Sequence, residues 1–373
     1  MPTVMIVMPR MVQYRVPLLE QLRGQLSAEG VQLRVVHGTA HGQTILQRDE
    51  ATLPWAESLP TRRLPAVGGR AVWLPVGSVR RGAALVIVPE GAGWLSNYDL
   101  LVRRPVGRFR LACWGHGPGE QDQAHSRASR AVRYGLARRF DWWFSYTDGT
   151  TRRLVDAGVS RSRISTLNNT IDVDAVRGHL PRSAAERSAV AHRLQLGDTS
   201  AAYIGALRAN KRIDLLLEAG QLVSERIPGF VLVIGGDGPM RGLVESAMVD
   251  SPWLRYVGPV FGEEKAQILG AVQLMLQPAW LGLVVLDAFA AGLPIVSFDR
   301  ASHSPEEEYL VDGVHGCRVR GGRTADLAAA VVKLLEDDDL RAQMGAAAYS
   351  AGSALTIEAM SDRFARGIRQ ALA

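Results

Sequence analysis

Residues 230–239, FVLVIGGDGP, form an apolar run that passes directly into a glycine-rich turn. Four further runs in the second half of the chain are equally short and nearly continuous in apolar residues: AAYIG (201–205), LRYVG (254–258), QLMLQP (273–278) and PIVSF (294–298). Segments with helical spacing separate these runs, near 211–226, 239–249, 262–270, 283–291 and 324–336. This alternation predicts a doubly wound parallel sheet covered on both faces. Ligands bind such sheets at the carboxyl ends of the strands.

The first half of the chain repeats the pattern, which predicts a second α/β domain. Its expected strands are 3–8, 31–37, 85–89, 110–114 and 142–146, with a helix over 16–29 and further helices between the later strands. A chain of 373 residues suits two such domains better than one core. We expect an N-terminal domain over 1–178 and a C-terminal domain over 196–355, joined by a polar tract around 176–198. A last helix over 356–373 is expected to pack back on the first domain.

The composition is that of an ordinary globular protein, with 47% hydrophobic and 21% charged residues. Cys113 and Cys317 are the only cysteines, too few for a disulfide framework or a metal motif, which favours a reducing cytoplasm. The start, MPTVMIVMPRM, lacks a basic region before its apolar run and is interpreted as a buried strand rather than a signal peptide. The uncharged stretch 266–286 is long enough to span a bilayer, but polar and turn residues interrupt it. We therefore expect no membrane span.

Arginine carries the formal net charge of +6, since lysine occurs only at Lys211, Lys265 and Lys333. Most of this charge is interpreted as solvated surface, but the excess favours an anionic partner: a nucleoside diphosphate, a phospholipid surface or nucleic acid. The segment 126–139 concentrates it, with Arg127, Arg130 and Arg133 on one helix face and Val132, Leu136 and Phe140 on another. Two interpretations stay open, a solvated face and a helix resting on an anionic membrane.

The turn after the run at 230–236 is a weak match to a dinucleotide-binding fingerprint. That fingerprint needs G-x-G-x-x-G after the first strand of its unit, and here Met240 and Arg241 precede Gly242. The first strand of the chain is followed by PRMVQ, which contains no glycine. The sequence therefore argues against an NAD-dependent enzyme.

Five blocks in order resemble the C-terminal domain of family 4 of the retaining GT-B glycosyltransferases: YIGALRANKRIDLLLEA, VLVIGGDGPMRGLVE, LRYVGPVFGEE, QPAWLGLVVLDAFAAGLPIVSFD and HSPEEEYLVDGVHG. Upstream, YTDGTTRRLVDAGVSRSRISTLNNTID is similar to the end of that family's N-terminal domain. The resemblance implies a GT-B fold, in which two Rossmann-like doubly wound domains face each other across a cleft. It also implies sugar transfer from a nucleotide-diphosphate donor, a UDP- or GDP-sugar, with retention of anomeric configuration.

The first block implies the cations that neutralise the donor diphosphate. The family has Gly-Arg-Leu and a lysine five positions after the arginine, and this chain has Gly205-Ala206-Leu207 with Lys211 at the lysine position. We expect Arg208 to supply the cation that Ala206 does not. The alternative is that Arg208 and Lys211 only solvate the start of a helix.

The fourth block departs from the family pattern of glutamate, seven residues, glutamate. Ala279 stands at the first position, where the family's carboxylate contacts the transferred sugar, and Asp287 at the second, where it accepts hydrogen bonds from the ribose. An acid inside LVVLDAFAA would be costly to bury without a partner, which favours a ligand role for Asp287 over a structural one. Backbone groups are expected to complete the donor site at five positions: Gly205, Gly258, Gly282, Leu283 and Val284. The last three open a helix, whose N-terminus suits an anion.

Three residues of the first half of the chain are expected to take part in the same sugar transfer. His116 follows an expected strand between two glycines, and the family places a histidine in such a loop, reaching toward the donor phosphate or the acceptor. Arg15, in the first strand-to-helix loop, and Glu90, after the strand at 85–89, are weaker candidates for contact with the acceptor or a phosphate. Helix-start packing is an equal alternative for Arg15.

The predicted reaction is metal-independent transfer to a hydroxyl of a glycan, lipid-linked or small-molecule acceptor. Lys211, Arg208 and His116 are the expected catalytic residues, with electrostatic stabilisation of the leaving diphosphate in place of a metal. No cofactor is expected beyond the nucleotide-sugar co-substrate, and Asp172-Val173-Asp174 is placed at the domain crossover rather than in a metal site. The alternatives are a GT-B-fold nucleotide-sugar epimerase, a non-catalytic glycosyltransferase-like subunit and, without any recognition motif, a nucleic-acid binder. The expected location is the cytoplasm, with the inner membrane face as an alternative.

Overall fold

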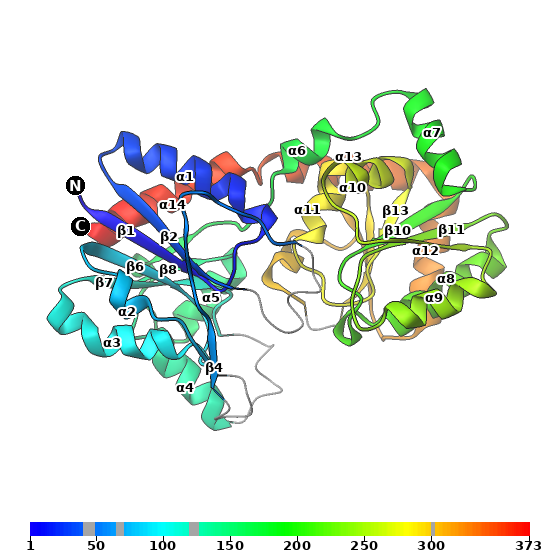
Figure 1. Cartoon of the computed structure of the whole chain (residues 1–373). Helices are drawn as coiled ribbons and strands as arrows, with labels where there is room; N and C mark the ends of the chain where they lie inside the picture. Colours follow the sequence, from blue (N-terminus) through cyan, green and yellow to red (C-terminus); the bar gives the residue numbers. More distant parts are fainter. Residues whose placement is uncertain (40–48, 65–70, 119–126, 300–302) are drawn as a thin grey trace. The chain divides into compact units, whose positions relative to one another are not determined.

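The computed structural model describes residues 1–39, 49–64, 71–118, 127–299 and 303–373, without the side chains of 127–130. The chain divides into two compact units (Figure 1). Unit 1 contains residues 1–169 and 357–373, and unit 2 contains residues 170–356. Each unit is an α/β domain built on a parallel sheet, as the strand and helix pattern predicts.

Unit 1 is built on a seven-stranded sheet with the order β3-β2-β1-β6-β7-β8-β9, every neighbouring pair parallel. Its strands are β1 (Thr3–Met8), β2 (Gln32–Gly38), β3 (Glu57–Leu59), β6 (Ala83–Pro89), β7 (Arg110–Gly115), β8 (Trp142–Ser145) and β9 (Ile164–Thr166). A short antiparallel pair, β4 (Arg62–Leu64) and β5 (Ala71–Trp73), lies apart from that sheet. The helices are α1 (Val16–Ala28), α2 (Val76–Val79), α3 (Leu95–Gly107), α4 (Arg127–Ala137), α5 (Asp148–Asp156) and α14 (Ile357–Leu372).

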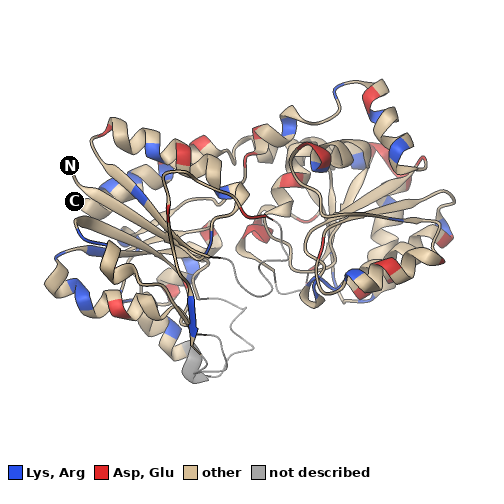
Figure 2. Ribbon diagram, in the orientation of Figure 1, with Lys and Arg blue, Asp and Glu red and all other residues tan. Residues whose placement is uncertain are grey.

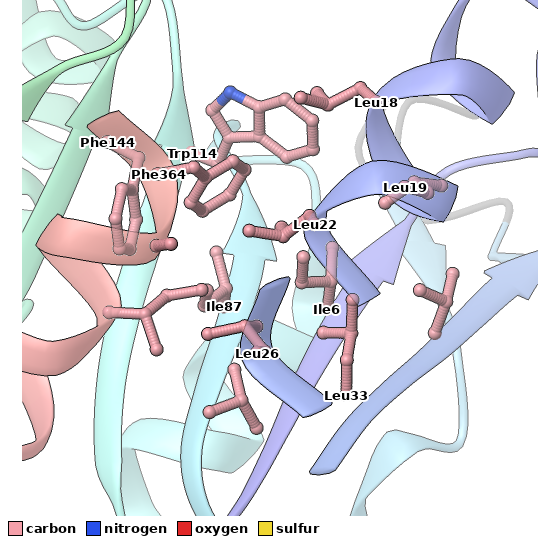
Figure 3. Close-up of a cluster of buried hydrophobic side chains, with 14 of the residues drawn as sticks. Ile6, Leu18, Leu19, Leu22, Leu26, Leu33, Ile87, Trp114, Phe144 and Phe364 are labelled. Atoms are coloured by element: carbon pink, nitrogen blue, oxygen red, sulfur yellow. The ribbon is translucent and has the colours of Figure 1, made fainter. Parts of the chain in front are cut away.

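Two cores cover the two faces of this sheet. On one face, α1 and α14 pack against each other and against the strands, with Leu18, Leu22 and Phe364 fully buried (Figure 3). Leucines spaced three and four residues apart give α1 the apolar stripe that this packing needs. The other face is buried under α3, α4 and α5, where Leu100 and Phe140 join the core.

Unit 2 is built on a six-stranded parallel sheet with the order β12-β11-β10-β13-β14-β15. Its strands are β10 (Ser200–Ile204), β11 (Val231–Gly235), β12 (Leu254–Gly258), β13 (Leu274–Leu276), β14 (Ile295–Phe298) and β15 (Gly316–Val319). The helices are α6 (Val173–Gly178), α7 (Ala184–Leu194), α8 (Ile213–Arg226), α9 (Arg241–Val249), α10 (Gly262–Ala271), α11 (Val284–Ala291), α12 (Thr324–Glu336) and α13 (Asp338–Ser353). All five residues of β10 and of β11 are buried, which explains why, apart from Ser200, their sequences contain no polar side chain.

The chain leaves unit 1 earlier than the sequence indicated. The N-terminal domain was expected to run to residue 178, but α6 packs on α10 and α11 and so belongs to unit 2. The tract around 176–198, expected as a linker, holds the end of α6 and all of α7. The last helix, α14, lies in unit 1.

The uncharged stretch 266–286 holds the end of α10, strand β13 and the start of α11, as the polar interruptions indicated. Within the described part of the chain, no helix has the length and apolar character needed to cross a membrane.

Candidate functional site

Three glycines at the carboxyl ends of β10 and β11 let two loops approach each other closely. A Cβ on Gly236 would lie 1.8 Å from the carbonyl oxygen of Gly205, and a Cβ on Gly238 would lie 2.5 Å from that of Leu207. Both glycines also have positive φ angles, of 156° and 153°. The loop that follows Gly205 is therefore fixed by backbone contacts, and it carries Arg208 and Lys211.

Lys211 is a half-buried cation at this sheet edge. Its Nζ donates to the carbonyl oxygen of Trp280 at 2.7 Å. Burial lowers the pKa of Lys211 to about 8, the positive charge of Arg208 adds to this lowering, and Glu306 opposes it. Among the described residues, the Arg208 guanidinium makes no hydrogen bond or ion pair, whereas neighbouring Arg212 pairs with Asp214. Two like charges thus influence each other at a half-buried place.

The loop after β13 is held from two sides. Trp280 has a φ of 49°, a left-handed conformation that costs a bulky residue about 1 kcal/mol. Its carbonyl is bound by Lys211, and the next amide, that of Leu281, donates to Nδ1 of His303 at 2.8 Å. Nε2 of His303 lies 2.9 Å from the carbonyl oxygen of Phe298, so the ring is neutral with its proton on Nε2. Burial lowers the pKa of His303, which agrees with that assignment.

The first turn of α11 is held by backbone hydrogen bonds. Leu283 is the N-cap and makes no side-chain capping hydrogen bond, and the amides of Val285 and Leu286 donate to the carbonyl oxygens of Gly282 and Leu283. Gly282 packs against Ser304, which a Cβ would meet at 3.2 Å. Gly258, at the end of β12, has a φ of 76° and open space where a Cβ would lie.

Asp287 has a partner that the sequence argument did not foresee. Its Oδ1 lies 2.6 Å from Nζ of Lys265 on α10, and the two side chains are only 10% and 20% exposed. The premise that a buried acid at 287 lacks a protein partner is therefore wrong. The ribose-binding role loses that support, although position 287 stays at the helix that follows the loop. Lysine occurs only three times in the sequence, and this rarity could have drawn attention to Lys265. Nothing in the sequence, however, pairs Lys265 with Asp287.

A cavity of about 410 Å³ lies in unit 1 at the carboxyl ends of β1, β6, β7 and β8. It brings together the three residues of the first half that the sequence singled out: Arg15, Glu90 and His116. Three aromatic rings line it as well, those of Tyr14, Trp114 and Tyr146. The sequence could not single out these aromatic residues, because aromatic side chains at strand ends are also ordinary core residues.

Arg15 is 3% exposed and lies among the rings. Its guanidinium carbon is 4.3 Å from the centroid of the Trp114 ring and 4.8 Å from that of Tyr14. It donates to Oδ1 of Asn169 at 2.8 Å and to the hydroxyl of Tyr146 at 3.1 Å. Arg15 lines the cavity and is also the N-cap residue of α1, so its position fits both alternatives that the sequence left open, contact with an acceptor or phosphate and helix-start packing.

His116 and Glu90 occupy neighbouring strand ends of the same cavity. The ring of His116 lies 4.5 Å from that of Tyr146, centroid to centroid. Oε2 of Glu90 accepts the amide of Gly117 at 2.7 Å, and Oε1 accepts from Arg133 at 3.1 Å. Both carboxylate oxygens are therefore engaged, so Glu90 positions the His116 loop and α4 rather than presenting a bare carboxylate to a ligand.

The residues form two groups, each within its own unit. Unit 2 carries Lys211, Arg208 and the loop before α11, and unit 1 carries the cavity around Arg15 and His116. The described residues contain no cluster of three or more His, Cys, Asp or Glu side chains that could hold a metal ion. Asp172, of the Asp-x-Asp sequence, caps α6 by accepting the amide of Ala175 at 2.8 Å.

Comparison with known proteins decides the family of unit 2. The family model described as "Glycosyl transferases group 1" matches residues 198–337. Residues 198–337 belong to the glycosyl transferases group 1 family. The match contains β10 to β15 and the whole candidate site of unit 2, so the resemblance of the five sequence blocks is confirmed.

Two curated relatives extend the comparison beyond the group 1 domain. The chain is 30% identical to a D-inositol 3-phosphate glycosyltransferase of Nocardia farcinica over 279 residues, which cover 70% of this chain and 60% of the relative. It is 29% identical to an alpha-D-kanosaminyltransferase of Streptomyces kanamyceticus over 149 residues, 38% of each protein. The chain therefore covers about 60% or less of the length of these relatives.

Solved structures show the fold of the whole chain. The HepE protein of Anabaena, in complex with UDP and glucose, superposes with a TM-score of 0.72 at 15% identity and covers 98% of this chain and 99% of its own. This likeness and the two parallel sheets confirm the expected GT-B class, in which a second Rossmann-like domain accompanies the group 1 domain.

Proposed function

We propose that this chain is a metal-independent retaining glycosyltransferase. Unit 2 binds a nucleotide-diphosphate sugar, and unit 1 binds the acceptor whose hydroxyl receives the sugar. The observation that carries the proposal is the pair of cations Lys211 and Arg208 at the carboxyl edge of the second sheet. Two like charges that repel each other at a half-buried place are both stabilised by an anion such as a diphosphate.

The neighbourhood of Lys211 supports a diphosphate in particular. The N-cap of α11 has no side-chain capping hydrogen bond, so the amides of Leu283 and Val284 and the positive end of the helix dipole would serve an anion. These groups and the two cations would stabilise the charge that develops on the leaving diphosphate, which is the work a metal performs in other enzymes. Asp287 would accept the ribose hydroxyls while Lys265 offsets its charge.

The cavity of unit 1 supports an acceptor site. It offers flat apolar surface from three rings, a histidine for proton transfer and arginines for a negatively charged group. A sugar or polyol can stack on such rings and bond to such polar groups. The similarity to an inositol 3-phosphate glycosyltransferase supports an acceptor with hydroxyls and an anionic group. The Anabaena structure with UDP and glucose supports a UDP-sugar as donor.

The test is thermal unfolding with UDP, GDP, ADP and dTDP, with and without EDTA. We expect one diphosphate to raise the melting temperature by about 5–10 °C at a hundredfold excess over its Kd. The rise should survive EDTA, vanish in Lys211→Ala and persist in Lys333→Ala, a control that removes an exposed lysine from α12. No stabilisation by any of the four, or an equal loss in both variants, would refute the donor site.

The same assay tests Asp287. The matching 2′-deoxyribonucleoside diphosphate should bind wild type more weakly than the ribonucleotide, and Asp287→Asn should remove this difference. If Asp287→Asn keeps the full preference for the ribonucleotide, the aspartate is only the partner of Lys265.

Donor consumption then separates the proposed reaction from its alternatives. Ala279 and Ala206 stand where the family has a carboxylate and an arginine, which motivates a non-catalytic subunit as the second candidate. Transfer to an acceptor at a rate that falls in His116→Ala supports the transferase. Epimerised product from donor alone, or binding without turnover on glycan, glycolipid and polyol acceptors, would refute it.

A further inference from the structure

Charge is distributed very unequally between the two units. Unit 1 contains 26 arginines against 14 acidic residues, a formal charge of +12. Unit 2 contains 17 basic against 23 acidic residues, a formal charge of −6. A genome rich in arginine codons would raise the arginine content of both units alike. The excess of positive charge in unit 1 therefore points to a property of that unit.

Within unit 1 the excess lies on one of the two helical layers. Residues 95–110 and 127–141, which contain α3, α4 and the turns after them, hold nine arginines and two aspartates. Residues 16–29 and 357–372, which contain α1 and α14 on the other face of the sheet, hold four arginines and four acidic residues. The two layers can be compared in Figure 2. The layer of α3 and α4 is therefore the more basic of these two helical layers of unit 1, and it is called the basic face here.

This basic face also exposes large apolar side chains. Val102 and Val106 on α3 are 79% and 91% exposed, and Val132 and Tyr134 on α4 are 51% and 37% exposed. Val102 and Val106 are one helical turn apart, with Pro105 exposed beside them. Of the apolar stripe that the sequence offered for a membrane, Leu136 on α4 and Phe140 after it are buried in the core, and only Val132 is exposed. The exposed apolar surface comes mainly from α3 instead.

The two helices are held together as one surface. Arg104 near the end of α3 donates to the carbonyl oxygen of Arg139 and to Asp141, both at 2.9 Å. Both helices also pack on the same buried cluster, with Leu100 from α3 and Leu136 from α4. The exposed arginines at 108, 110, 138 and 139 lie at this junction.

We infer that the face formed by α3 and α4 docks on an anionic lipid bilayer. Arginines supply attraction to acidic headgroups, and the valines supply short apolar side chains that enter the interface. Charge alone would fit a nucleic acid equally well, but neighbouring exposed valines give no stacking platform for bases and are favourable in a lipid interface. This inference stands on unit 1 alone and does not depend on the sugar-transfer reaction.

The test is sedimentation of the full-length protein with vesicles of phosphatidylcholine alone or with 30% phosphatidylglycerol, on the order of that in anionic cell membranes. We expect binding only to the anionic vesicles, and about tenfold weaker binding when salt rises from 0.1 to about 0.5 M. Arg110→Glu/Arg139→Glu should weaken binding at least about tenfold. Val102→Gln/Val106→Gln should weaken it severalfold and leave no binding at high salt. Both valines are exposed, so this variant should fold normally.

The matched control is Arg366→Glu/Arg23→Glu, which makes the same charge change on α14 and α1, the helices that cover the other face of the sheet of unit 1. It should bind as wild type does. The inference is overturned if wild type does not bind anionic vesicles or if it binds neutral vesicles equally well. It is also overturned if the control variant loses as much vesicle binding as the arginine variant. It is also overturned if the valine variant binds unchanged while a single-stranded oligonucleotide competes with the vesicles, because the face would then be a polyanion site without lipid specificity.

Discussion

Lys211 shows how one side chain can link ligand binding to pH. The folded protein lowers its pKa from 10.5 to about 8, so between these values the unfolded chain holds a proton that the folded chain has released. Stability from this group therefore rises with pH through that window, and below about pH 8 both states are protonated and the slope is absent. The pH dependence of diphosphate binding has the opposite sign: affinity falls as pH rises, because a diphosphate binds the charged ammonium of Lys211.

We predict that diphosphate binding takes up about half a proton per molecule near pH 8, because half of the Lys211 side chains are neutral there. Affinity should fall as pH rises from 8 to 10. Calorimetric titration in two buffers of different ionisation enthalpy measures the uptake.

Lys211→Arg is the control for this prediction, since arginine keeps a positive charge and does not titrate in this range. It should bind without proton uptake near pH 8. An equal uptake in Lys211→Arg would assign the proton to another group and contradict the role given to Lys211.

Asp287 marks the limit of sequence reasoning at the residue scale. The position of Asp287 and its need for a partner could be predicted from the sequence, because an aspartate inside an apolar helix is costly to bury alone. The identity of the partner could not, because Lys265 reaches it from a different helix, 22 positions earlier in the chain. Tertiary pairs of this kind leave no local signal. His303 is similar, since its hydrogen bonds to Leu281 and Phe298 depend on the course of the loops around it.

At the scale of elements, strands with a continuous buried run were predictable, whether short or long, and short strands with partly exposed positions were not. β10 and β11 have five buried residues each and a clear apolar run. β3, β9 and β15 have three or four residues with partly exposed positions, so packing at the sheet edges rather than apolar pattern creates them. Four strand ends of unit 1 converge on one cavity, which the order of the strands dictates but the sequence does not state.

The Glu90 carboxylate joins three of these elements, the ends of β6 and β7 and helix α4. We predict that Glu90→Ala lowers the free energy of unfolding of unit 1 by about 2 kcal/mol, because it leaves the Gly117 amide and Arg133 without their charged acceptor. Urea unfolding followed by tryptophan fluorescence measures the loss.

Glu57→Ala provides a matched comparison in the same unit. Glu57 pairs with Arg34 at 3.1 Å, the same distance as between Glu90 and Arg133, but its side chain is 43% exposed against 15% for Glu90. An exposed pair is worth less than about 1 kcal/mol. Equal losses in the two variants would show that Glu90 is an ordinary surface pair and does not fix the strand ends.

At the scale of the whole molecule, the sequence predicted two α/β domains but not the point where the chain passes from one to the other. The helix over 173–178 looks like part of the first domain in sequence, yet its packing partners α10 and α11 come about 90 to 110 residues later. Only the three-dimensional contacts decide its unit. The same holds for α14, which belongs to the first unit although the whole second unit precedes it.

Two separate cores predict two separable unfolding transitions. Phe364 of α14 is fully buried in unit 1 against Trp114 and Phe144, and Phe289 of α11 is fully buried in unit 2. Each Phe→Ala substitution should cost its own unit about 3–5 kcal/mol. Phe289→Ala should lower the calorimetric transition that a nucleoside diphosphate raises, and Phe364→Ala should lower the other one. A shift of both transitions by the same amount in both variants would mean that the two units unfold together. Unit 1, which ends with α14 after the whole of unit 2, would then depend on the stability of unit 2.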